Sequence, residues 1–239
     1  MHINSQLGKL YLIPTTLGDT APLEVMPGMV QRIVYDLDEF IVENEKTARR
    51  FIKQLCRDKS QPSLILHPLN KHIDNSEIPA YLDSCLSGRS VGLMSEAGVP
   101  GIADPGAEVV RLAHEKGIQV VPLVGPSSIL MAMMSSGMNG QNFAFNGYLP
   151  IDQKEKRQEL KRLENISRDH GQSQLFIETP YRNNKLIEEL CNTLNPATRL
   201  CIACDITLAS EFIVTKPISI WKTKQPDIHK RPALFIIQA

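Results

Sequence analysis

Several features that would place a protein in a class at once are missing from this sequence. No stretch of 18 consecutive apolar residues occurs, and residues 1–6 lack the basic-then-apolar pattern of a secretion signal, so we expect a cytoplasmic protein without a membrane anchor. Neither sign of charge is in excess, because 26 Lys and Arg balance 26 Asp and Glu. A polyanionic partner would therefore have to bind a local basic patch, since the net charge offers no general attraction.

Cysteines and histidines are few and follow no ligand spacing. The cysteines are odd in number and scattered: Cys56, Cys85, Cys191, Cys201 and Cys204. Cys201 and Cys204 form an isolated C-x-x-C within an apolar stretch, without the second pair that a zinc site needs, so we expect buried thiols in a reducing compartment. His67, His72 and His114 match no metal-ligand pattern, so no metal site is predicted.

The short motifs of common catalytic sites are also absent. No G-x-G-x-x-G follows the first apolar stretch and no G-x-x-x-x-G-K-[ST] occurs, which argues against the usual dinucleotide and P-loop sites. No serine lies in a G-x-S-x-G elbow, which requires a strand before it and a helix after it, and no cysteine has a histidine placed by a known local motif. Covalent catalysis is not indicated.

The most informative segment that is present extends from Val91 to Ile129. Apolar stretches at 91–94 and 118–123 predict two strands, and the two-faced stretch that begins near Ala107 predicts a helix closed by Gly117. Residues 95–106 are too rich in glycine and proline to form a regular element. The segment therefore predicts a βαβ unit whose strands both end in open loops.

Small residues follow three of the predicted strands, in the loops after Ile13, Met94 and Val124. Such loops bring backbone N–H and C=O groups close to a ligand, and open α/β sheets bind ligands at these strand ends. Asp104 is the only ionised group between residues 98 and 106. It could hold an ammonium group or ribose hydroxyls, or it could cap a helix that begins at Pro105.

The rest of the chain predicts two α/β domains, residues 1–139 and 140–239. Helices and strands alternate regularly in the first, which favours a mostly parallel sheet, whereas strands lie closer together in the second, which favours a mixed sheet. The predicted helices include 22–36, 43–55, 78–86, 129–134, 186–194 and a strongly charged one at 154–168; the other strands are expected at 10–13, 40–42, 63–69, 143–150, 175–177, 199–204, 211–215 and 233–238.

Five spaced motifs carry a resemblance to a known family. In order, they are Leu10-Tyr11-Leu12-Ile13-Pro14-Thr15, Ser95–Pro100 with Asp104-Pro105-Gly106, Val121–Ser128, Gly147-Tyr148-Leu149-Pro150, and Glu178-Thr179-Pro180-Tyr181-Arg182. Their order resembles that of the tetrapyrrole (corrin/porphyrin) methylase family, and most of all its branch that methylates ribose 2′-hydroxyls of cytidine in small-subunit rRNA. The resemblance extends from Gly8 to about Gln238.

This resemblance implies a homodimer that binds S-adenosylmethionine in a cleft between its two α/β domains. Carried over by motif, the cofactor-binding residues are Pro14, Ile102, Ala103, Asp104, Ala107, Ser127, Ser128, Ile129, Glu178, Thr179, Ile206 and Ala233. A ribose hydroxyl is a poor nucleophile, so a proton acceptor is expected near that cleft. The candidates are Glu43, Glu96 and Glu178, with substrate contacts expected from Lys46, Arg49, Tyr148 and Arg182.

Two other interpretations remain open at this stage. The acceptor could be a tetrapyrrole or another small molecule, although the charged helix at 154–168 suits a phosphate backbone better than a macrocycle. The chain could also be a non-catalytic RNA- or ribosome-binding relative. The segment Glu43-Asn44-Glu45-Lys46-Thr47 favours that alternative, because the ribosomal branch usually has an acidic residue followed by Asp-Thr-Arg there.

Overall fold

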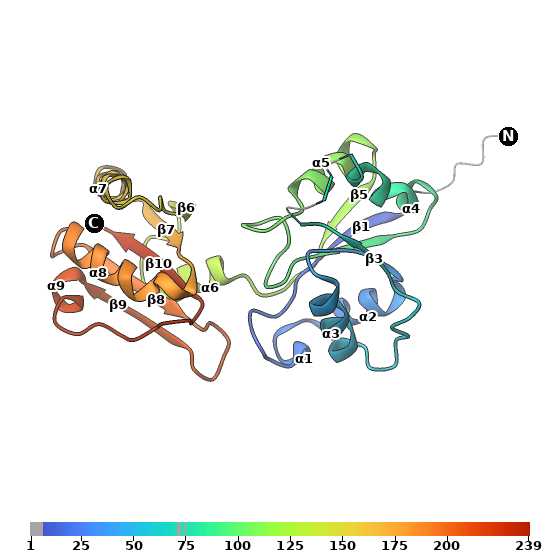
Figure 1. Cartoon of the computed structure of the whole chain (residues 1–239), viewed down its shortest axis with the longest axis horizontal. Helices are drawn as coiled ribbons and strands as arrows, with labels where there is room; N and C mark the ends of the chain where they lie inside the picture. The colour runs from blue at the N-terminus through green and yellow to red at the C-terminus, as the bar shows by residue number, and fades with distance from the viewer. Residues whose placement is uncertain (1–6, 71–72, 75) are drawn as a thin grey trace. The chain divides into compact units, whose positions relative to one another are not determined.

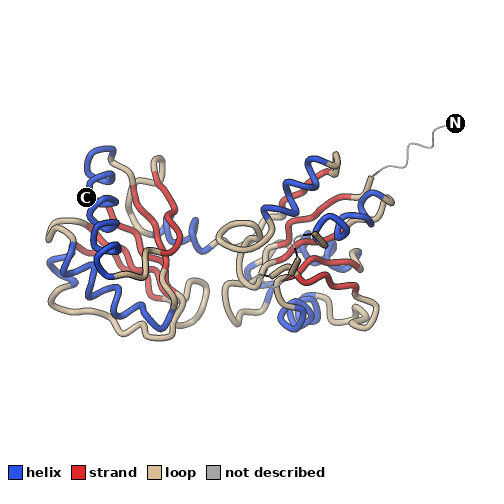
Figure 2. The backbone as a smooth tube through the Cα atoms, turned by 45° about the horizontal axis from the view of Figure 1, so that its top comes forward, coloured by secondary structure: helices blue, strands red, loops and turns tan. Residues whose placement is uncertain are grey.

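The computed structural model describes residues 7–70, 73–74 and 76–239 (Figures 1 and 2). His72 and the N-terminal segment considered above lie outside these residues. The chain divides into two compact units, and the second is Ser128–Ala239. The division falls earlier than the boundary expected after residue 139, because helix α6 (Ser128–Ser135) packs against strand β10 (Ala233–Gln238) of the second unit.

A five-stranded parallel sheet forms the centre of the first unit. Its order is β3-β2-β4-β1-β5, and its strands are β1 (Lys9–Ile13), β2 (Glu39–Val42), β3 (Ile65–Pro68), β4 (Val91–Met94) and β5 (Gln119–Pro122). Leu12 of β1 lies between Leu93 of β4 and Pro122 of β5. Because neighbouring strands are parallel, their carboxyl ends share one edge of the sheet.

The helices of the first unit differ from expectation in two places. They are α1 (Pro22–Val25), α2 (Gly28–Asp36), α3 (Glu45–Leu55), the 3₁₀ helix η1 (Ile78–Leu82), α4 (Asp83–Leu86) and α5 (Ala107–Glu115). The single helix expected at 22–36 is wrong: Met26 and Pro27 are extended and separate two helices, since Pro27 has no N–H to donate and disfavours helical geometry at Met26. The helix expected at 78–86 begins as a 3₁₀ turn.

Both faces of the parallel sheet are buried. Alternate residues of β2 point to opposite faces, so Phe40 packs with residues of α2 and α3, whereas Ile41 packs with residues of α5. At Gly92 of β4, an added Cβ would lie 2.6 Å from a side-chain atom of Ile13. Continuous apolar strands are typical of a parallel sheet covered on both sides.

The letters from Gly88 to Gly92 spell G-x-S-x-G, but the structure excludes a nucleophile elbow there. Ser90 precedes β4 instead of following a strand, and its hydroxyl accepts the backbone N–H of Lys9 at 3.0 Å. This hydrogen bond therefore stabilises the position of the start of β1 next to the start of β4.

The second unit contains a mixed five-stranded sheet of order β6-β7-β10-β8-β9. Its further strands are β6 (Phe143–Tyr148), β7 (Ser173–Ile177), β8 (Arg199–Cys204) and β9 (Phe212–Pro217). Strands β6 and β7 are parallel, and the other neighbouring pairs are antiparallel. The expectation of a parallel sheet in the first α/β unit and a mixed sheet in the second is confirmed.

Besides α6, the helices of the second unit are α7 (Gln153–His170), the 3₁₀ helix η2 (Pro180–Arg182), α8 (Asn183–Thr193) and α9 (Ile218–Trp221). Helices α7, α8 and α9 contribute residues to one apolar core that contains Phe176, Trp221 and Phe235. Helix α7 has an Asp152 N-cap and a left-handed Gly171 at its end. In the part of the chain that the structure describes, no helix is both long and apolar enough to span a bilayer.

All five cysteines are buried free thiols, as expected. Cys201 and Cys204 are three residues apart on β8, so their side chains leave opposite faces of the sheet and cannot act as a dithiol. Burial raises the pKa of the Cys204 thiol to about 11, which keeps it protonated and unreactive at neutral pH.

Candidate functional site

The three loops of small residues lie together at the carboxyl edge of the first sheet. Thr15, just after β1, donates its N–H to the carbonyl of Gly98 at 2.8 Å and accepts the Gly98 N–H at 3.2 Å. A Cβ added to Gly125 would lie 2.2 Å from a ring carbon of Pro14, so the loop after β5 passes directly against the loop after β1. Glycine at this position leaves room for the Pro14 ring, which any Cβ would overlap.

The residues expected to hold a cofactor in the loop after β4 are accessible. Ile102 is 53% exposed, and Ala103 has a left-handed φ of 62°, unusual for a residue with a side chain. Asp104 follows and is half-buried. Helix α5 begins at Ala107, and its N-cap residue is Gly106, which has a φ of 136°. No side chain makes a capping hydrogen bond at this end of the helix. The alternative in which Asp104 caps this helix is therefore wrong.

Three carboxylates gather beside this loop: Glu43 after β2, Glu96 after β4, and Asp104. The backbone N–H of Glu96 donates to Glu43 Oε2 at 3.4 Å, and the Thr47 hydroxyl donates to Glu96 Oε1 at 3.2 Å. Burial, then the charges of Asp104 and Glu96, raise the pKa of Glu43. Burial and the charge of Glu96 also raise the pKa of Asp104, against a hydrogen bond from Ser95.

This carboxylate cluster, Glu43, Glu96 and Asp104, has no cation paired with it among the described residues. Mutually repelling, partly desolvated carboxylates favour either a proton or a positively charged ligand. The cluster therefore suits a cationic ligand, and Glu43 suits proton transfer because its pKa is raised toward neutrality.

The divergent segment after β2 has an ordered role in the structure. Asn44 caps α3, and its side chain accepts the N–H groups of Lys46 and Thr47. Lys46 is exposed in the first turn, whereas Arg49 donates to the carbonyl of Gln61 at 2.6 Å. The substitution of Asn for the usual Asp keeps the cap, since both side chains accept backbone N–H groups at this position.

In the second unit, the strand ends expected to contact the cofactor also share an edge. Register pairs Ala233 with Cys204 and Leu234 with Ile177, so the start of β10 lies between the ends of β8 and β7. Glu178 and Thr179 follow β7, and buried Ile206 follows β8. The second unit begins with α6: Ser128 is the first residue of this helix, and Ile129, the next, is buried.

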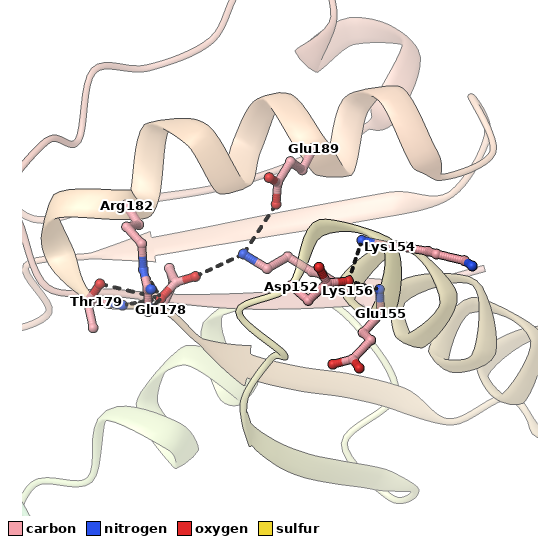
Figure 3. A network of polar contacts seen from close by, with 8 residues as sticks. All are labelled: Asp152, Lys154, Glu155, Lys156, Glu178, Thr179, Arg182 and Glu189. Atoms are coloured by element: carbon pink, nitrogen blue, oxygen red, sulfur yellow. Dashed lines mark hydrogen bonds and ion pairs between the residues drawn. The ribbon is translucent and has the colours of Figure 1, made fainter.

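Glu178 is held by polar contacts shown in Figure 3, and the side chains of Lys156, Glu178 and Glu189 in this network are buried. Lys156 Nζ lies 3.3 Å from a carboxylate oxygen of Glu178 and 3.3 Å from one of Glu189. Arg182 bonds the other Glu178 oxygen at 2.7 Å, and the Thr179 N–H donates to it at 2.8 Å. Burial alone would raise the pKa of Glu178, but these donors together lower it.

Lys156 and Glu189 were not predicted as site residues, although a signal was available. Lys156 precedes the buried Leu160 and Leu163 by four and seven residues, so it continues the apolar stripe of α7. A lysine on such a stripe must either extend its ammonium group to water or pair with a buried carboxylate. Lys156 is 5% exposed and pairs with the buried carboxylates of Glu178 and Glu189.

The remaining substrate candidates are accessible. Tyr148, at the end of β6, is 61% exposed. The Arg182 side chain is 38% exposed even though it bonds Glu178. Both can therefore reach a ligand on the surface of the second unit.

Residues 9–220 match the family model of tetrapyrrole (corrin/porphyrin) methylases. The ribosomal RNA small subunit methyltransferase I of Bacillus subtilis is 30% identical over 217 residues, covering 90% of this chain and 69% of the relative. The protein of the same name from Vibrio cholerae is 27% identical over 213 residues, covering 88% and 69%.

Solved structures share the fold at lower identity. The uroporphyrin-III C-methyltransferase of Thermus thermophilus, solved with S-adenosylhomocysteine, superposes with a TM-score of 0.57 at 14% identity, covering 97% of both chains. The family match over most of the chain and the identity to these relatives lead to one conclusion: the chain belongs to the tetrapyrrole (corrin/porphyrin) methylases, a family of methyltransferases.

Proposed function

We propose that this methyltransferase transfers a methyl group from S-adenosylmethionine to a ribose 2′-hydroxyl of small-subunit rRNA. The observation that carries the proposal is the 26–31% identity, over most of the chain, to relatives named ribosomal RNA small subunit methyltransferase I. The solved uroporphyrin-III and cobalt-precorrin-4 methyltransferases are only 14–17% identical, a level that shows the fold and does not identify the acceptor.

The first unit has the chemistry that this cofactor requires. S-adenosylmethionine supplies an electrophilic methyl group on a positively charged sulfur and carries a second positive charge on its ammonium. The carboxylate cluster offers negative charge that no cation of the described part of the chain pairs with, and the loops around Pro14, Ile102, Ala103 and Asp104 offer backbone groups at the sheet edge. We assign cofactor contacts to these residues and to Ala107 and Ser127.

In the second unit, we assign cofactor contacts to residues at the shared strand edge and at the start of α6. These are Ser128, Ile129, Thr179, Ile206 and Ala233, together with Glu178. Glu178 accepts bonds from Arg182, Lys156 and the Thr179 N–H, and its lowered pKa makes it a weak base. Its proposed role is to hold the Thr179 backbone and Arg182 in place.

Alignment is the main requirement of methyl transfer, because the reaction is an in-line displacement in which positive charge on sulfur disperses. The ribose hydroxyl must also lose its proton. We assign that proton to Glu43, whose raised pKa suits a general base and which Glu96 and Asp104 surround with negative charge. Lys46, Arg49, Tyr148 and Arg182 are proposed to contact the RNA substrate, and a homodimer is the proposed assembly.

The proposal is tested by mass spectrometry of ribose methylation in small-subunit rRNA from a deletion strain. Loss of one ribose methyl group, restored by the wild-type gene and not by Glu43→Gln, is expected. An unchanged methylation pattern would refute the rRNA assignment and favour a tetrapyrrole or another small acceptor. Calorimetry with S-adenosylmethionine provides the second measurement, because a non-catalytic relative that binds no cofactor would give no heat.

A further inference from the structure

The exposed side of α7 carries positive charge in one strip. Lys154, Arg157, Gln158 and Lys161 follow the spacing i, i+3, i+4, i+7, so at 100° per residue they lie within roughly a third of the helix circumference. The acidic Glu159 lies on the neighbouring strip and is already paired with Arg162 at 2.6 Å. Glu155 and Glu164 border the strip, and Glu164 accepts hydrogen bonds from the Asn195 N–H and the Thr198 hydroxyl.

This strip lines a hollow of about 480 Å³ with Asn192 and Thr193 at the end of α8. Each of its lining side chains carries a group that can donate a hydrogen bond, and none of these side chains is acidic. Within the described residues, neither Lys154, Arg157 nor Lys161 is part of an ion pair. We call this hollow the basic groove.

The electrostatic balance of the basic groove is positive. The carboxyl end of α8 contributes partial negative charge, equivalent to about half an elementary charge. The three side chains of α7 contribute one full positive charge each. Lysine and arginine without protein partners attract anions, and the neutral amides of Gln158 and Asn192 can donate hydrogen bonds to the same anion.

We propose that the basic groove binds the phosphodiester backbone of the RNA substrate. The proposal rests on the proposed function and extends it to a surface formed by α7 and α8. Charge complementarity identifies the occupant: a phosphate backbone needs several cations in a row and side-chain donors, and the groove supplies both. No aromatic side chain lines it, so it does not provide a platform for base stacking.

The test compares two double variants of the full chain that each remove two positive charges from α7. Arg157→Gln/Lys161→Gln alters the basic groove, whereas Arg162→Gln/Arg168→Gln removes arginines that pair with Glu159 and Asp169. Affinities are measured by filter binding from 50 to 300 mM KCl. The probes are small ribosomal subunits from the deletion strain and a 20-base-pair RNA duplex.

For the groove variant we expect about tenfold weaker binding to both probes near 100 mM salt, and a salt slope shallower by about 1.5 to 2, since each lost phosphate contact removes about 0.9. The paired-arginine variant should bind within about twofold of wild type. Melting temperature and S-adenosylmethionine affinity should be unchanged in both.

Equal losses in the two variants would overturn the proposal, because net charge alone would then explain them. A loss limited to the ribosomal subunit, with duplex binding intact, would also overturn it and indicate a protein contact. If the wild-type enzyme binds subunits but methylates no rRNA, the proposed function fails, while the comparison of the two variants still decides whether the groove binds RNA.

Discussion

The buried lysine of the second unit allows a quantitative prediction. Replacing Lys156 with Met removes the cation that lies 3.3 Å from both Glu178 and Glu189. Glu178 keeps Arg182 and the Thr179 N–H, so Glu189 is the carboxylate left unpaired; Lys156 is its one ion-pair partner among the described residues. Breaking a buried pair in this way destabilises proteins by about 3–5 kcal/mol.

An independent estimate sets a ceiling for the same loss. Glu189 can avoid an unpaired buried charge by taking up a proton. Protonating a glutamate costs about 1.4 kcal/mol for each unit by which the pH exceeds the pKa of a free glutamate, roughly 4.3. At pH 7 the total cost is about 4 kcal/mol. We therefore expect Lys156→Met to lose about 3–4 kcal/mol at pH 7 and much less at pH 5, because the variant binds a proton on folding and that proton becomes scarcer as pH rises.

The assay is urea unfolding followed by the fluorescence of the single tryptophan, Trp221, which is 2% exposed in the core of the second unit. The double variant Lys156→Met/Glu189→Gln should recover most of the loss, since no unpaired charge remains. Lys161→Met, an exposed lysine on the same helix, should change stability by about 0.5 kcal/mol or less. A loss under about 1 kcal/mol, an equal loss at pH 5 and pH 7, or no recovery in the double variant would refute the reasoning.

Three further predictions concern the first unit. Glu43→Gln should lower kcat by about 10²- to 10⁴-fold and abolish the rise of rate with pH, because the raised pKa of Glu43 makes its ionised form scarcer at low pH; an unaltered pH–rate profile would exclude it as the base. Asp104→Asn should weaken S-adenosylmethionine binding in calorimetry by about tenfold, roughly 1.4 kcal/mol, with no loss of melting temperature, since Asp104 does not cap α5; reduced stability with unchanged affinity would contradict this. Gly125→Ala should destabilise the protein in urea by about 1–3 kcal/mol, because the new Cβ would overlap Pro14, whereas Gly117→Ala, also a loop glycine, meets no atom within 4 Å and is strained only by its φ of 70°.

Local sequence rules predicted much of the fold. The alternation of strands and helices, the charged helix near residues 154–168 and the βαβ unit at 91–129 all follow from periodicity and turn residues. The single helix expected at 22–36 is wrong for a local reason, because Pro27 divides a helix that the apolar pattern alone would continue. The start of the second unit at Ser128 depends instead on a long-range contact, the packing of α6 against β10.

The sequence predicted which loops are open at the strand ends, but not the polar contacts of the candidate site. The loops after β1, β4 and β5 were recognised by their small residues, and parallel strand order brings such ends to one edge. The pairing of Lys156 with Glu178 and Glu189 was not recognised, because it joins residues 22 and 33 positions apart through the packing of α7, β7 and α8.

The sequence by itself determined the elements, the open loops and, through its motifs, the family, because hydrophobic period, turn chemistry and motif spacing are properties of neighbouring residues. Only the tertiary structure decided which charges meet. It placed Glu43, Glu96 and Asp104 together with no cation paired to them among the described residues, buried Lys156 between two carboxylates, and left three cations of α7 beside the end of α8. Electrostatic interactions depend on distance and burial, and both arise only when segments remote in the chain pack against each other.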